Sequence, residues 1–509
     1  MEALLRVLPD GLPVSLQVVA ATIIFGVVYA LITADRPFAG LPVLHLDGKS
    51  DRKTWMFNGR EALKEGLKRF SGPFQVITGT GPKIVVPNRF ANELRNHPSL
   101  NFNKAFAKDF PVNYPGFEPH KQGITHDHLV QETVRVKLTQ SLGLVTNDLI
   151  DETIASVHDV FGDNKEWTTR KIRDDIIEVV ARLSSRVFLG PDLCRNRRWL
   201  EISKSYTIDS FVAARLMRVA PAFLRPIVYL LLPQSRRLRQ AVRDARTMID
   251  PEVERRKAIV DAAHAAGEKA PKVADTIGWM YEVGKGENID LVAGQLSLTM
   301  AAIHTTTETT CQALIDICQY PEAAQQMREE IVQVIKENGW AKTSLYKLRL
   351  MDSFLKEGQR LHPMATASMN RYVEEDIKLS DGTVLPKGSR LMVSTDFMDP
   401  EIYPEPEKFD AARFLKMRQE PGQENSWQFV ATSPSHMLFG HGQHACPGRF
   451  FASNEIKIAL CHLLLKYDWR LAPGEERPTS RSFELVDSFN PETLIQVRRR
   501  TPEFDIDNI

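Results

Sequence analysis

The sequence predicts a mainly helical fold with small β-sheets, preceded by one N-terminal helix long enough to span a membrane. Helical patterns dominate from His126 to Asn338. Two hairpin signals, at residues 74–86 and 377–385, place limited strand content on either side of that helical body. No Gly/Ser-rich linker or repeat divides the 509 residues, so residues 37–509 are expected to form one large domain.

The N-terminal residues differ in composition from the rest of the chain. Residues 11–34 carry no charged side chain, and about twenty apolar residues suffice to cross a bilayer. A cleavable signal peptide is the alternative, although its apolar core is normally about 7–15 residues after a basic segment. More positive charge follows the apolar run, including Lys49, Arg52 and Lys53, than precedes it at Arg6. Residues 1–36 are therefore expected to be a single-pass anchor with the remainder in the cytosol.

Charge and cysteine content argue against a nucleic-acid-binding protein and against a disulfide-stabilised one. The net charge is +1 and no basic stripe is present, which argues against nucleic acid as a partner. The cysteines are odd in number and unpatterned, which suits a reducing compartment better than a disulfide framework. They are Cys194, Cys311, Cys318, Cys446 and Cys461.

The body of the chain contains three further distinctive segments. Residues 102–125 are rich in aromatic residues and have no clear period, which predicts a long irregular loop. Residues 211–232 are apolar, but their arginines disfavour a second membrane span, so either a surface segment or a buried helix pair is expected. Residues 291–307 contain no Asp, Glu, Lys or Arg, which predicts a helix buried through the middle of the domain. A second anchor is the alternative there, although the Ser/Thr content and Glu308 argue against it.

The most informative feature is the glycine-punctuated loop at residues 439–448, which holds the single thiol of Cys446. A lone thiolate in such a loop can ligate a heme iron, and thiolate ligation favours oxygen activation. Residues from Arg449 onward predict a helix, whose N-terminus favours the thiolate. Two alternatives remain at this point. The cysteine could be a small buried apolar residue, or it could bind zinc with nearby histidines, although the paired spacings typical of zinc sites are missing.

The loop resembles the heme-binding signature of the cytochrome P450 family. The matching positions are Phe439, Gly442, His444, Cys446 and Gly448. Three other landmarks of that family follow the expected order: Glu357–Arg360, residues 409–414 and residues 301–306. The sequence departs from the family pattern at His444, which replaces arginine, at Ala411, which replaces proline, and at Ala302, which replaces glycine.

This resemblance implies the cytochrome P450 fold and a heme b cofactor. It makes Cys446 the axial ligand of the heme iron and places Phe439 at the heme. It also implies that His444 and Arg371 pair with heme propionates, for which the fork of an arginine is well suited. An exposed arginine is the alternative reading of Arg371. Glu357, Arg360 and Arg413 are expected to form a buried structural network, although an isolated Glu-x-x-Arg is usually a surface ion pair.

Proton delivery is expected to involve Thr305. The family usually has an acid immediately before this threonine, and here that position is His304. Histidine can relay protons near neutral pH, so both residues are catalytic candidates. Glu308 could substitute one turn later, or it could be a structural carboxylate.

The resemblance further implies a monooxygenase that inserts one oxygen atom from O2 into a lipophilic substrate. Electrons would come from NADPH through NADPH-cytochrome P450 reductase, with cytochrome b5 as a further possible partner. The segments at 301–306 and 371–377 resemble fungal members that act in secondary metabolism, which makes a terpenoid the leading substrate class. Two alternatives are a rearrangement or dehydration without external electrons and a non-catalytic heme sensor.

The resemblance also implies a subcellular location and a substrate-binding cavity. Membrane-bound members of the family lie on the cytosolic face of the endoplasmic reticulum membrane, which agrees with the predicted single-pass anchor. The aromatic loop, residues 211–232, residues 363–368 and Phe489 are expected to surround an apolar substrate cavity.

Overall fold

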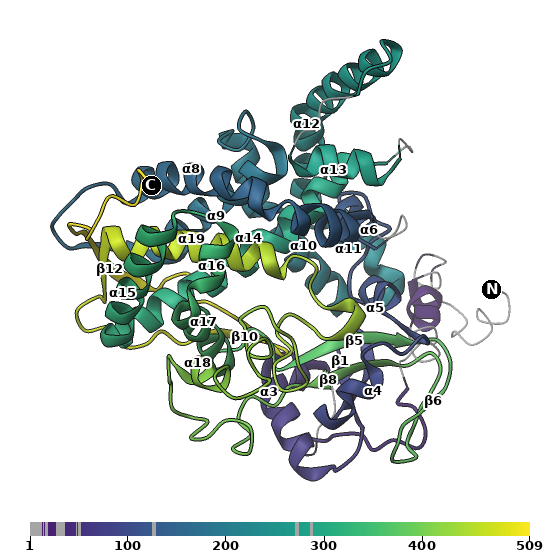
Figure 1. Cartoon of the computed structure of the whole chain (residues 1–509). Coiled ribbons are helices and arrows are strands. Elements are labelled where there is room, and N and C mark those ends of the chain that lie inside the picture. The colour runs from purple at the N-terminus through teal and green to yellow at the C-terminus, as the bar shows by residue number, and fades with distance from the viewer. Residues whose placement is uncertain are drawn as a thin grey trace.

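The computed structural model describes residues 13, 15, 19–26, 36–46, 48, 52–124, 129–269, 274–285 and 289–509. Helices form most of the molecule, and the main sheet lies together with α3 and α4 on one side of it (Figure 1). The predicted mainly helical class with small sheets is therefore confirmed.

Helices account for most of the described residues. The α-helices are α3 (Arg52–Arg69), α4 (Ala91–Leu94), α5 (Phe102–Asp109), α6 (Glu118–Gln122), α7 (Leu129–Glu132), α8 (Leu142–Phe161), α9 (Ile172–Leu189), α10 (Arg197–Val219), α11 (Arg225–Leu231), α12 (Pro233–Ala265), α13 (Thr276–Val283), α14 (Leu291–Gln319), α15 (Pro321–Asn338), α16 (Lys342–Lys347), α17 (Arg349–Leu361), α18 (Arg413–Met417) and α19 (Arg449–Lys466). Shorter 3-10 or π turns are η1 (Asn88–Phe90), η2 (Thr133–Leu138), η3 (Ala222–Leu224) and η4 (Gly442–His444).

The main sheet has five strands in the order β1-β2-β8-β5-β3. Its strands are β1 (Phe74–Thr78), β2 (Gly81–Val86), β3 (Leu100–Asn101), β5 (Ala367–Val373) and β8 (Arg390–Ser394). β1 and β2 form the first predicted hairpin, which closes where Thr78 pairs with Gly81. β5 pairs antiparallel with β8, and its register shifts between Ser368 and Arg371.

Three smaller sheets lie outside the main one. β12 (Leu494–Arg499) pairs with both β4 (Thr168–Lys171) and β9 (Tyr467–Leu471). β6 (Ile377–Lys378) and β7 (Val384–Leu385) form the second predicted hairpin. The remaining pair is β10 (Arg481–Phe483) and β11 (Val486–Ser488).

Helix α14 runs through the core, as the uncharged run at residues 291–307 predicted. Asp290 caps its N-terminus by accepting a hydrogen bond from the N–H of Ala293 at 2.9 Å. The helix ends at Gln319, two residues before Pro321, whose ring cannot continue the same helix and instead begins α15. Around it pack α6, α9, α10, α17 and α19.

The aromatic segment at residues 102–125 is less irregular than expected. It contains two short helices, α5 and α6, so the prediction of a continuous irregular loop was wrong there. Asn101 caps α5 by accepting a hydrogen bond from Lys104 N at 2.9 Å, and Pro119 stands in the first turn of α6. These local signals outweigh the low helix propensity of the aromatic residues.

Residues 211–232 form the end of α10, then η3 and α11. Many of their large apolar side chains are exposed, which favours the surface segment over the buried helix pair. The exposed residues are Phe211, Leu216, Val219, Phe223, Leu224, Ile227, Leu230 and Leu231.

The predicted anchor at residues 1–36 lies largely outside the described residues. Its described part is a helical stretch at 19–26, in which Ile23 and Phe25 are each 60% exposed. A Cβ built on Gly26 would lie 3.1 Å from the Phe223 ring, so this stretch lies against η3. Where the structure describes the chain, none of its helices combines the length and apolar character needed to cross a bilayer.

Candidate active site

The cysteine loop is closed by its own backbone. The N–H of Cys446 donates to the carbonyl of Phe439 at 2.6 Å, and that of Ala445 donates to Gly442 at 3.0 Å. Gly442 has φ 75°, and a Cβ there would lie 2.5 Å from the carbonyl oxygen of Arg95. Only glycine meets both requirements without displacing neighbouring backbone. The loop therefore presents the thiol of Cys446 in one fixed position before α19.

Two opposing effects act on the Cys446 thiol. Burial raises its pKa, while the backbone N–H groups of Gly448 and Arg449 and the charge of Arg449 lower it. Burial is the larger effect, so the start of α19 offsets only part of the desolvation that opposes the thiolate. A bound metal cation would deprotonate such a thiol directly.

The nearby histidines have other partners. Nε2 of His441 lies 3.0 Å from Oδ1 of Asn92. His436 is fully desolvated, and its Nε2 lies 3.4 Å from the carbonyl oxygen of Lys356. Across the described ranges, no group of three or more His, Cys, Asp or Glu residues could hold a metal ion. The zinc alternative therefore has no support from these residues.

Two candidate heme contacts, His444 and Arg371, lie near one aromatic ring. The ring of His444 stacks on Phe102 at a centroid distance of 6.0 Å. The guanidinium of Arg371, on β5, lies 5.7 Å from the centre of the same ring. Phe439 packs edge-on against Phe429 at 5.4 Å.

Arg371 is a buried cation, not an exposed one. It is 3% exposed, and burial lowers its pKa to about 10. Its Nη1 donates to the carbonyl of Asn370 at 2.8 Å. No carboxylate of the described residues forms an ion pair with it. A buried guanidinium of this kind requires an anion, and a heme propionate beside the Cys446 loop fits that requirement.

Glu357, Arg360 and Arg413 form the buried network that was expected. The carboxylate of Glu357 accepts two hydrogen bonds from Arg360, at 2.8 and 2.9 Å, and one from Arg413 at 2.9 Å. Both Glu357 and Arg360 are 0% exposed, so the alternative of a surface ion pair is excluded. Arg360 also donates to the carbonyl of Phe397 at 2.8 Å.

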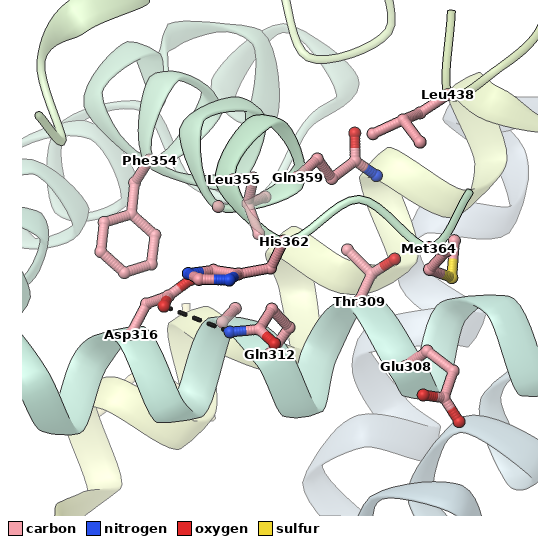
Figure 2. Close-up of a pocket in the computed structure, with 12 residues that line it drawn as sticks. Glu308, Thr309, Gln312, Asp316, Phe354, Leu355, Gln359, His362, Met364 and Leu438 are labelled. Carbon is pink, nitrogen blue, oxygen red and sulfur yellow. Dashed lines mark hydrogen bonds between the residues drawn. The ribbon is translucent and has the colours of Figure 1, made fainter. Parts of the chain in front are cut away.

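A small pocket of mixed polar and apolar lining lies between α14 and α17 (Figure 2). The space open to the centre of a water molecule is about 20 Å³, and one water needs roughly 10–15 Å³. Oδ2 of Asp316 and Oε1 of Gln359 are buried there without a hydrogen-bond partner in the described chain. A Cβ on Gly358 would lie 2.7 Å from that Oδ2, which explains the glycine between Glu357 and Arg360.

Thr305 lies on an exposed face in the middle of α14. It and Ala301, four positions earlier, are exposed, whereas Ile303, Thr306 and Thr307 are buried. The Thr305 hydroxyl donates to the carbonyls of Ala301 and Ala302, at 2.8 and 3.2 Å. This hydroxyl is thus held by its own helix on a side of α14 that protein atoms do not fill.

His304 points in another direction, toward α9 and α10. Its Nε2 lies 2.9 Å from the carbonyl oxygen of Lys204, and its Nδ1 lies 3.4 Å from Arg173 Nη2. The pKa of His304 is lowered to about 4, mainly by burial; the hydrogen bond with the Lys204 carbonyl opposes this shift and the charge of Arg173 adds to it. The structure therefore does not bring the two catalytic candidates together.

Glu308 is held by two partners. Arg173 Nε donates to its carboxylate at 3.2 Å, and the backbone N–H of Phe489 donates to the other oxygen. Burial raises the pKa of Glu308, and both partners oppose that shift. These contacts agree with the structural-carboxylate alternative.

Two residues of this region were not singled out from the sequence. Arg173 contacts both His304 and Glu308, and Glu455 is a fully buried carboxyl that accepts a hydrogen bond from Ser184 Oγ at 2.7 Å. Burial raises the pKa of Glu455 to about 8. A single acid within the apolar run of α19 was the available signal, because carboxylates are seldom fully buried. Nothing in the sequence indicated the contacts of Arg173.

A helical fold with one loop-held cysteine and a buried arginine that needs an anion defines a heme-thiolate protein. The model of the cytochrome P450 family matches residues 100–498. The chain is 42% identical to cytochrome P450 monooxygenase bsc2 of Alternaria brassicicola, over 93% of this chain and 92% of that protein. It is 45% identical to bsc11 of the same fungus, over 90% and 89% of the two chains. It is 41% identical to adrA of Penicillium rubens, over 89% of each chain.

The chain therefore belongs to the cytochrome P450 family. Both the predicted family and the predicted enzyme class, a monooxygenase, are confirmed, and membership of the family implies heme.

Proposed function

We propose that this monooxygenase inserts one oxygen atom into a lipophilic substrate of fungal secondary metabolism, with terpenoids as the leading class. The observation that carries the proposal is the closed loop that presents Cys446 at the start of α19, a helix that packs against α14, on which Thr305 is exposed. The fungal relatives support the setting. Heme bound through a thiolate supplies oxygen activation.

The residues that would hold the heme are Cys446, whose thiolate would ligate the iron, Arg371 and His444, which would pair with the propionates, and Phe439, which would pack against the cofactor. Support comes from the position of Arg371, which lacks a carboxylate partner in the described part of the chain, and from the Phe102 ring that contacts both basic side chains. Glu357, Arg360 and Arg413 fix the protein core on this side through their hydrogen bonds.

Thr305 positions a proton donor, either its own hydroxyl or a water bound to it, on the exposed face of α14. His304 remains a candidate only if it leaves its contacts with Lys204 and Arg173, since in this arrangement it is neutral at pH 7 and both ring nitrogens are occupied. Thr305 is therefore the stronger of the two candidates.

Electrons come from NADPH through NADPH-cytochrome P450 reductase, with cytochrome b5 as a second donor. The enzyme resides at the endoplasmic reticulum membrane through an anchor at residues 1–36, and residues 37–509 form the cytosolic catalytic domain. Support for membrane contact is the exposed apolar surface of η3 and α11, against which the helical stretch at 19–26 lies.

The test uses microsomes that contain the full chain. Reduced protein exposed to carbon monoxide should give the red-shifted Soret band of thiolate ligation, and added reductase and NADPH should support oxidation of members of a terpenoid panel. Absence of the band would overturn heme-thiolate ligation. Turnover that needs no NADPH would instead identify a rearrangement or dehydration, and a normal band without any turnover would identify a heme sensor. Alkaline carbonate extraction tests the anchor, because an integral protein stays with the membrane.

A further inference from the structure

One face of α10 combines exposed apolar side chains with a single arginine that lacks a polar partner. Ile208, Phe211 and Val219 are 47%, 47% and 62% exposed. Arg215 lies on the same face, because residues spaced by three or four positions are neighbours on a helix surface. We call Ile208, Phe211, Arg215 and Val219 the α10 stripe.

The α10 stripe contacts two segments that are far apart in the sequence. The ring of Phe211 meets Phe110 edge-on, at a centroid distance of 5.0 Å. The guanidinium of Arg215 lies over the ring of Phe483, on β10, at 3.3 Å from its centre. The stripe therefore bridges the aromatic segment that follows α5 and the β10–β11 hairpin.

Residues close in the chain to both bridged segments contact the candidate active site. At the start of α5, Phe102 contacts Arg371 and His444. Just after β11, the N–H of Phe489 donates to Glu308, one turn beyond Thr305 on α14. Helix α10 itself packs against α14. The α10 stripe thus contacts two segments, the one after α5 and the β10–β11 hairpin, whose neighbours in the chain contact residues of the candidate active site.

Arg215 differs from the other arginines of α10, because it is half-buried and has no polar partner in the described chain, whereas Arg197, which also has none, is exposed. Arg198 forms ion pairs with Asp244 and Glu201, and Arg218 donates to the carbonyl of Ala214 at 3.3 Å. Within the described chain, Arg215 has neither an ion pair nor a hydrogen bond to its guanidinium. It is half-buried, and burial and the nearby charge of Arg218 lower its pKa, whereas Glu484 raises it. A partly desolvated cation of this kind is stabilised by an anion that it can bind through two parallel hydrogen bonds.

We propose that Arg215 binds an anionic oxygen group, a carboxylate foremost, on the lipophilic substrate. The apolar side chains of the stripe, with Phe110 and Phe483, then contact the hydrocarbon part of the same molecule. This arrangement, apolar lining with one charged group that fixes orientation, is typical of small-molecule sites. The inference rests on the proposed function and adds a substrate class to it: lipophilic acids.

A lipid headgroup phosphate presents the same chemistry to an arginine. The contact with Phe483 favours a substrate carboxylate over a lipid phosphate as the bound anion. It holds the guanidinium of Arg215 against the β10–β11 hairpin and away from the exposed apolar side chains of α11. The experiment includes an arm for each source.

The ligand arm compares a diterpenoid carboxylic acid with its methyl ester. Binding of each to the full-length holoenzyme is measured by isothermal titration calorimetry, so the readout does not depend on turnover. The acid should bind more tightly than the ester, and Arg215→Gln should weaken acid binding by about tenfold to 100-fold, as expected when one charged hydrogen-bonded pair is lost. Ester binding should not change. The affinity of Arg215→Lys for the acid should lie between those of the wild type and Arg215→Gln, because lysine keeps the charge but cannot form two parallel hydrogen bonds.

The matched control is Arg198→Gln, which changes an arginine of the same helix that is already paired. It should leave both dissociation constants unchanged. Equal affinity of the wild type for acid and ester, or an equal loss for both ligands in Arg215→Gln, would overturn the inference.

The lipid arm measures binding of the same variants to vesicles with and without an anionic phospholipid. If Arg215→Gln weakens binding to the anionic vesicles and leaves acid binding unchanged, Arg215 contacts headgroups and the inference is wrong. A normal thiolate Soret band and NADPH-dependent oxidation of neutral terpenoids, together with no preference for acids, would overturn this inference alone. Loss of the Soret band in the wild type would overturn the proposed function instead.

Discussion

Around Glu357 each charged group is matched by a partner, whereas on α14 the hydroxyl of Thr305 bonds to carbonyls of its own helix and faces an exposed side. The first region is 0% exposed at Glu357 and Arg360, and its contacts leave little freedom. In the second region, the hydroxyl of Thr305 stays accessible because no other described segment packs over this face of α14. The two regions of one domain therefore differ in how fully other segments of the chain satisfy their polar groups.

We call the first region, around Glu357, and the Cys446 loop together the cysteine side. The largest expected effect on this side is that of Cys446→Ser. A serine keeps the loop geometry and the hydrogen bond from residue 446 to Phe439, but it replaces the thiolate. We expect loss of the thiolate Soret band and of monooxygenase activity, because thiolate donation favours oxygen activation. Cys318→Ser, at a partly buried cysteine on α14, is the control and should keep both. Retention of the band in Cys446→Ser would identify another ligand.

Glu357→Ala tests whether the network around Glu357 maintains the fold. It leaves two buried arginines without their carboxylate, so we expect a loss of roughly 3–5 kcal/mol in the free energy of unfolding. Denaturant unfolding of the holoenzyme would measure this loss. Glu401→Ala, at an exposed glutamate, should change stability little. A loss below 1 kcal/mol at Glu357 would mean that this region is no more rigid than the α14 face.

Thr305→Ala tests the α14 side. Because the hydroxyl is already held by Ala301, its removal should leave folding intact and lower product formation per NADPH consumed by about tenfold or more. Thr305→Ser keeps the hydroxyl and should retain most of the coupling. Product and NADPH are measured together in reconstituted membranes. Unchanged coupling in the alanine variant would transfer proton delivery to another residue.

Glu455 lies between the two regions, since it is on α19 and has hydrogen bonds from Ser184 on α9 and Thr306 on α14. Its pKa is raised to about 8 in the folded protein from an ordinary value of 4.5. Between those two values the unfolded chain loses the proton while the folded protein keeps it. Stability from this group is thus fully present below pH 4.5 and is lost as the pH rises toward 8, by at most about 1.4 kcal/mol per pH unit.

Glu455→Gln should remove that slope, because the amide does not titrate. The free energy of unfolding measured at several pH values between 5 and 8 would show it as a flatter curve for the variant. Identical slopes in variant and wild type would show that Glu455 is ionised in the folded protein.

The cysteine side was largely predictable from the sequence, and the α14 side was not. The spacing of Phe439 to Gly448 determines a closed loop by itself, and Glu357 and Arg360 share a helix face whatever surrounds them. The direction of His304 depends instead on where α9 and α10 supply Arg173 and the Lys204 carbonyl. Local spacing carries no information about such contacts between distant segments.

The short helices α5 and α6 show the same limit at the level of secondary structure. Aromatic content and the lack of a period predicted an irregular loop, yet the cap at Asn101 and Pro119 in the first turn of α6 start helices there. The hairpins at 74–86 and 377–385 were predictable because their turns contain glycine between strand-forming residues.

The register shift in β5 determines where an inserted residue can be tolerated in this part of the chain. Met369, within the shift, has φ 52°, a backbone state that costs a non-glycine residue about 1–2 kcal/mol. An inserted residue before Ser368 could be absorbed by that irregularity. One inserted between Met369 and Arg371 would turn the arginine to the opposite face of the sheet, because side chains alternate along a strand. Natural length variation should therefore accumulate at residues 363–367 and stop short of Arg371.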